Sequence, residues 1–187
     1  LTAARDSRPH EQTHLIERQL MTRPLVLAIF IFAASFVSGI LLAQDESEFD
    51  WQALGEKTFS TNCAGCHQMN GQGVPTVFPP HAGHLPNVIA KEGGRQYLIR
   101  VLLNGLQGEI RVKGKTYNQI MPSWNALRDE EIAAVLNHEL TNWGNAEMLP
   151  EDFAPILPGE VAAGRTNDIT ATQVYELRQT LNLSADE

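Results

Sequence analysis

Two cysteines and a histidine stand close together in the chain. Cys63, Cys66 and His67 form the pattern Cys-Ala-Gly-Cys-His, and the 187 residues contain no other cysteine. The C-x-x-C-H pattern is typical of covalent haem attachment. Two thiols three positions apart on a turn can each bond one edge of a porphyrin, and the imidazole that follows then lies over the iron. We therefore expect one haem c, attached at Cys63 and Cys66, with His67 as an iron ligand.

Other chemistries of a close cysteine pair fit the sequence less well. A redox-active dithiol favours a β-α-β context, which this sequence does not show, and it has no need of His67 directly after the second cysteine. A structural zinc site needs further cysteines or histidines at matching spacing. Covalent haem attachment is therefore the interpretation that the pattern favours.

The second axial ligand of the iron must come from elsewhere in the chain, and methionine is the first candidate. Three of the four methionines are poorly placed, because they lie in an apolar leader, beside the attachment motif or after the last core helix: Met21, Met69 and Met148. Met121 remains. Pro122 follows it and prevents a continuing helix, so the chain can present the thioether inward. We expect Met121 to ligate the iron.

Alternatives to Met121 stay open at the sequence level. Methionine also fills gaps in hydrophobic cores, because its thioether is soft and flexible. His81 and His84 could stand near the iron, although a packing or surface role is favoured for both. Without Met121 on the iron, the haem would have an open or displaceable position, and the protein would be a haem enzyme or a gas sensor.

An uncharged apolar segment precedes the motif. Residues 24–44 carry no charge, and residues 25–43 are apolar enough to enter a bilayer. Their length lies between that of a cleaved signal and that of a membrane anchor. The anchor is slightly favoured over the cleaved signal. A cut after Ala43 would place Leu41 two positions earlier, where signal peptidase prefers a small residue. Arginines precede the segment and acidic residues follow it, so the remaining chain should face the non-cytoplasmic side.

The segments of the chain follow from these features. We predict an N-terminal arm at 1–23, a signal peptide or membrane anchor at 24–44, a haem-binding domain at 45–148, and a C-terminal tail at 149–187 with a short helix near 171–181. Residues 1–20 fit two interpretations equally well, a short cytoplasmic arm or sequence upstream of a start at Met21.

Apolar spacing predicts the regular elements of the domain. Helices are expected at 49–62, 95–104 and 129–142, a glycine- and proline-rich loop at 71–86, and a hairpin or extended loop at 109–117. The helix at 129–142 is the clearest prediction. Its first turn is acidic, which suits the positive end of the helix dipole, and one of its faces is apolar. Arg128 before it cannot act as an N-cap side chain, so Asp129 is expected to cap the helix.

Several stretches, in this order and spacing, resemble the class I cytochromes c. They are residues 63–67, 68–73, 78–80, 105–106, 117–122, 129–132 and 143–145, within a match that covers about 51–145. More narrowly, they are similar to bacterial mono-haem cytochromes that serve periplasmic dehydrogenases, nitrite reductase systems and terminal oxidases. Where relatives usually have leucine after the paired prolines, this chain has His81.

The resemblance implies an all-α, class I cytochrome c fold, with three core helices around a covalently bound haem. It places His67 and Met121 on opposite haem faces. It also implies that a carbonyl in the segment Phe78-Pro79-Pro80, that of Pro79, accepts a hydrogen bond from His67 and so fixes the ring.

A haem closed by His67 and Met121 has no open site for a substrate, so we expect outer-sphere electron transfer rather than catalysis. The protein would be a carrier or an electron-transfer subunit of a dehydrogenase, reductase or oxidase system. A net charge of −8 argues against nucleic-acid binding and favours redox proteins with basic patches as partners. We expect it in the periplasm or on the non-cytoplasmic face of the inner membrane, held there by residues 24–44 if they are retained.

Overall fold

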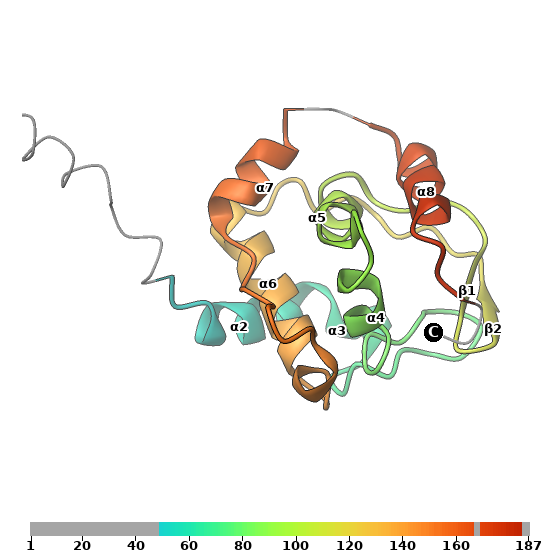
Figure 1. Ribbon diagram of the computed structural model, residues 1–187, viewed down its shortest axis with the longest axis horizontal. Coiled ribbons are helices and arrows are strands. Elements are labelled where there is room, and N and C mark those ends of the chain that lie inside the picture. The colour runs from blue at the N-terminus through green and yellow to red at the C-terminus, as the bar shows by residue number, and fades with distance from the viewer. Residues whose placement is uncertain (1–48, 167–168, 185–187) are drawn as a thin grey trace, which may run out of the picture. The chain divides into compact units, whose positions relative to one another are not determined.

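The computed structural model describes residues 49–166 and 169–184, which form a mainly helical domain with a two-stranded hairpin (Figure 1). Its helices are α2 (Gln52–Asn62), α3 (Ala64–His67), α4 (Leu85–Ile89), α5 (Gly94–Asn104), α6 (Asp129–Thr141), η2 (Ala146–Met148), α7 (Pro158–Gly164) and α8 (Ala171–Thr180). The predicted arm and the predicted signal or anchor, residues 1–44, lie outside the described residues. Among the residues described, no helix combines the length and the apolar character that crossing a membrane requires.

The first and third predicted core helices, α2 and α6, pack directly against each other. Gly55 of α2 lies at the contact, where a Cβ atom would overlap the carbonyl oxygen of Ala134 and stand 2.8 Å from Cβ of His138. Glycine therefore lets the two helix backbones approach closely. Phe59 of α2 and Leu136 of α6 are buried in the core that this contact helps to form.

Helix α6 begins at Asp129, as the sequence predicts, but its cap differs from the expectation. The backbone N–H of Arg128 donates to Oε2 of Glu131 at 2.9 Å, which satisfies a group at the helix start. Asp129 instead receives a hydrogen bond of 2.6 Å from Nε of Arg165. The prediction that Asp129 caps α6 is wrong, because Asp129 is the first residue of the helix and Arg128 stands at the N-cap position.

Helix α5 packs one face into the core and precedes the hairpin in the chain. Its buried face carries Tyr97, Leu98, Ile99, Leu102 and Leu103, and it ends at Gly105 with φ +79°. Strands β1 (Ile110–Val112) and β2 (Lys115–Tyr117) pair antiparallel. Both turn residues between them have positive φ, as a tight type I′ hairpin requires. The predicted hairpin is thus present, and α4 adds one short helix at the end of the predicted loop.

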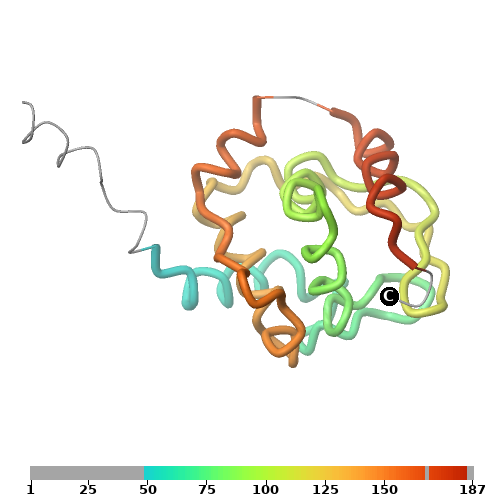
Figure 2. Tube along the Cα trace, viewed as in Figure 1, coloured from blue at the N-terminus to red at the C-terminus, as the bar shows by residue number. Residues whose placement is uncertain are grey.

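The described part of the tail packs against the rest of the domain and contains two helices rather than the single one predicted (Figure 2). Helix α7 contacts α5 and α6, and helix α8 contacts α5. Buried Asn137 of α6 bonds both backbone groups of Ile156, and Arg95 of α5 binds the carboxylate of Glu160. These long-range contacts, rather than local periodicity, hold the tail in place.

Candidate functional site

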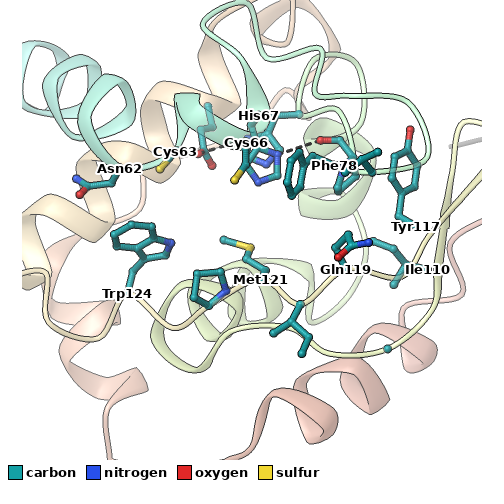
Figure 3. A pocket seen from close by; sticks show the side chains of 17 residues that line it. Asn62, Cys63, Cys66, His67, Phe78, Ile110, Tyr117, Gln119, Met121 and Trp124 are labelled. Carbon is teal, nitrogen blue, oxygen red and sulfur yellow. Dashed lines mark hydrogen bonds and ion pairs between the residues drawn. The ribbon is translucent and has the colours of Figure 1, made fainter.

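The cysteine pair and His67 lie on one turn that continues from the end of α2. The backbone N–H groups of Cys66 and His67 both donate to the carbonyl of Cys63, at 3.1 and 2.9 Å. Cys63 and His67 are buried, whereas Cys66 is exposed. Burial raises the pKa of the Cys63 thiol. The fold therefore brings the three residues together at one wall of a cleft (Figure 3).

His67 is held in one orientation by the loop that follows it. Its Nδ1 lies 3.0 Å from the carbonyl oxygen of Pro79, so the hydrogen bond implied by the resemblance is present. Gly73, at φ +61°, lets this loop fold back, since a Cβ atom there would overlap the carbonyl oxygen of Phe78. The N–H of Gly73 also donates to the carbonyl of His67 at 2.9 Å.

The protonation state of His67 suits an iron ligand. Burial lowers its pKa to about 3, with nearby His81 acting in the same direction and the Pro79 hydrogen bond opposing both. The imidazole is therefore neutral at pH 7. Because Nδ1 donates its proton to Pro79, Nε2 keeps a lone pair that can bind a metal.

Met121 lies across the cleft from His67, with its thioether pointing into the space between them (Figure 3). Its backbone pairs with that of Leu106 through two hydrogen bonds of 3.0 Å, one in each direction. A Cβ atom at Gly105 would stand 2.6 Å from the Met121 carbonyl oxygen, so the glycine permits this approach. Pro122 follows directly and is also among the cleft-lining residues.

The cleft between these walls contains about 700 Å³ of space free of protein atoms, part of which is open to solvent. Most of its further lining residues are apolar or aromatic: Val77, Phe78, Ile110, Tyr117, Ile120 and Trp124. A flat apolar cofactor with a metal at its centre fits this donor set, with two thiols and an imidazole on one wall and a thioether on the other.

The other candidate ligands lie elsewhere. The ring of His81 stacks on that of His67, with centroids 3.8 Å apart, so it occupies the same wall and not the opposite one. His84 is buried and is not among the cleft-lining residues. Met69 and Met148 are 62% and 47% exposed and are also outside the lining. Of the candidates for the second ligand that the structure describes, Met121 is the one that faces His67.

One cleft residue was not expected from the sequence. Glu139 of α6 lines the cleft with a side chain only 3% exposed, and its Oε1 lies 3.3 Å from Nδ1 of His81. A signal for it does exist, because Glu139 follows Ile132 and Leu136 at helical spacing and so falls on the apolar stripe of the helix. A charged residue on such a stripe indicates a buried polar partner.

A helical domain in which a C-x-x-C-H turn faces a methionine across an apolar cleft defines the class of mono-haem c-type cytochromes. Residues 52–143 match the family model described as cytochrome c. The chain is 54% identical over 132 residues to cytochrome c-552 of Thermus thermophilus, covering 71% of this chain and 99% of the relative.

Two further relatives match a shorter part of this chain. The cytochrome c subunit of the quinone alcohol dehydrogenase of Gluconobacter oxydans is 36% identical over 93 residues, 49% of this chain and 18% of the relative. Cytochrome c6 of Tetradesmus obliquus is 35% identical over 89 residues, 44% of this chain and 81% of the relative. The chain belongs to the cytochrome c family as a class I, mono-haem member. It carries one covalently attached haem c and is an electron carrier, as the sequence predicts.

Proposed function

We propose that this protein transfers electrons through a closed haem, whose iron would be held by Nε2 of His67 and the sulfur of Met121. The observation that carries the proposal is the position of Met121 directly across the cleft from His67. The haem, when bound, supplies a one-electron change at its iron. The chain supplies the ligands, their orientation and the exclusion of water, and it leaves no position for a substrate.

His67 contributes a fixed and electron-rich ligand. The hydrogen bond from Nδ1 to Pro79 sets the tautomer and increases the basicity of Nε2, as such outer partners do in metal sites. Cys63 and Cys66 would hold the porphyrin edge next to this ligand. Replacing both cysteines by alanine should therefore give protein without covalent haem and with little folded structure. Haem staining on a denaturing gel measures this, and a normally stained double variant would contradict the attachment.

Met121 contributes a thioether, which favours the reduced state and so raises the reduction potential. Electrons would enter and leave at the exposed rim of the cleft, where Cys66 and Ile120 are exposed. A redox protein can dock there without displacing a ligand. The net charge of −8 favours partners with basic docking surfaces.

The Met121→Ala variant tests the ligand assignment, with Met148→Ala as the matched control because Met148 is exposed and lies outside the cleft. Met121→Ala should lose the weak red iron–sulfur absorption band of the oxidised protein and should show a lower potential. Met148→Ala should keep both properties of the parent. A Met121→Ala spectrum and potential equal to those of the parent would contradict the ligation.

We further propose that the haem domain works on the non-cytoplasmic side, in the periplasm or at the inner membrane. The support is the uncharged segment 24–44 with arginines before it and acidic residues after it. Protease added to intact cells should spare the haem domain and should digest it once the outer barrier is opened. Alkaline washing of the membranes then distinguishes an anchored protein, which stays in the membrane fraction, from a protein released by signal cleavage. Mild detergent extraction, followed by identification of the proteins that co-purify, reveals the electron donor or acceptor. Holoprotein in the cytoplasmic fraction would contradict the location.

A further inference from the structure

The tail helix α8 lies against the segment that leads from α5 to β1 (Figure 1). The backbone N–H of Gln107 in this segment donates to the carbonyl of Ala171, the first residue of α8, at 3.1 Å. The ring of Tyr175 sits directly on Gly108, since a Cβ atom at Gly108 would overlap the ring. Gly108 also lines the cleft. Tyr175 of the tail therefore packs against a residue that forms part of the cleft wall.

The same segment holds the backbone of Met121. Leu106, one residue before Gln107, makes both hydrogen bonds with the N–H and the carbonyl of Met121. Met121 has no other backbone polar group, so Leu106 sets the position of its main chain. A continuous path of contacts thus runs from α8 through residues 106–108 to Met121.

Helix α8 is itself firmly placed. Its start is capped by Thr170, whose side chain accepts the backbone N–H of Gln173. Val174 is fully buried, and the guanidinium of Arg178 stands 5.9 Å over the ring of Tyr97 while donating to the carbonyl of Arg111 at 3.3 Å. The helix can therefore act as a fixed support rather than move with the segment that it contacts.

We propose that Tyr175 is a positioning residue for the methionine ligand, which keeps residues 106–108 in place so that the Met121 thioether stays on the iron. This inference rests on the proposed ligation by Met121. The thioether can leave the iron only if its backbone or side chain moves, and such local openings cost less than global unfolding. Removing the Tyr175 ring leaves residues 106–108 without their outer contact and lowers that cost.

Imidazole binding to the oxidised holoprotein measures the opening, because imidazole can bind the iron only after the thioether has left. Tyr175→Ala should bind imidazole about tenfold more tightly than the parent, as a modest change in the opening equilibrium would give. Tyr175→Phe keeps the ring and should bind as the parent does. Tyr175→Leu should change affinity in the same direction as Tyr175→Ala and serves if the alanine variant does not fold.

Val161→Ala is the matched control, since Val161 is a fully buried tail residue of α7, which contacts α5 and α6. It should lower thermal stability and leave the imidazole affinity unchanged. An equal increase of affinity in Val161→Ala would overturn the inference, because the effect would then be one of general stability. Parental affinity in Tyr175→Ala and Tyr175→Leu, with strong binding by Met121→Ala, would overturn the positioning role alone. A parent that binds imidazole as tightly as Met121→Ala would overturn the ligation as well.

Discussion

One of the side chains that hold the tail against the domain is the buried amide of Asn137 in α6. Its Nδ2 donates to the carbonyl of Ile156 at 2.9 Å, and its Oδ1 accepts from the N–H of Ile156 at 2.7 Å. Both residues are fully buried. The amide therefore replaces the backbone pairing that a strand or helix would otherwise give to Ile156.

Asn137→Ala should remove both hydrogen bonds and leave a buried N–H and a buried carbonyl unpaired. Each unpaired group costs about 1–3 kcal/mol, so the free energy of unfolding should fall by about 3 kcal/mol. This is a large part of the roughly 5–15 kcal/mol that stabilises a typical domain. Guanidinium titration of the holoprotein, followed by circular dichroism, measures the change.

Asn125→Ala is the control, because the side chain of Asn125 is exposed. Its effect should stay within about 0.5 kcal/mol, as for most surface substitutions. A loss below about 1 kcal/mol in Asn137→Ala would refute the reasoning, since it would mean that the tail does not rely on this pair.

Two further predictions concern packing and pH. Gly55→Val should destabilise the protein by about 2 kcal/mol or more, because the valine side chain would clash with the Ala134 carbonyl where α2 and α6 meet. Gly65→Ala is the control, since a Cβ atom there meets no protein atom, and it should be nearly neutral. Thermal melts measure both changes. The hydrogen bonds from Arg95 lower the pKa of Glu160 below its usual value of 4.5. The ion pair therefore adds stability above about pH 4.5, and this contribution is lost as pH falls through the folded-state pKa. The stability difference between parent and Glu160→Gln, measured by denaturant titration from about pH 6 to pH 3, should shrink with falling pH, and a constant difference would contradict the pairing.

Local patterns predicted most of the haem domain. Apolar spacing indicated α2, α5 and α6, and turn residues indicated the hairpin, because each of these signals is contained within about a dozen residues. The spacing of the C-x-x-C-H motif indicated the haem. The placement of Met121 was inferred by elimination among four methionines, and it faces His67 in the structure.

The tail and its polar contacts with the rest of the domain could not be predicted in the same way. Helix α7 is short and begins with Pro158 and Gly159, so it has little periodicity of its own. Its position depends on partners far along the chain, such as Arg95 for Glu160. Likewise, Arg165 of the tail donates to Asp129 at the start of α6, far from it in the sequence. Such contacts are properties of the folded chain and leave no local signature.

Carbon monoxide binding by the reduced holoprotein tests the closed haem most directly. Carbon monoxide needs a free position on ferrous iron, and the proposed ligands His67 and Met121 leave none. The visible spectrum of the reduced protein should therefore stay unchanged under carbon monoxide. A prompt shift to the spectrum of a carbon monoxide complex would contradict ligation by Met121 and would favour a haem enzyme or a gas sensor.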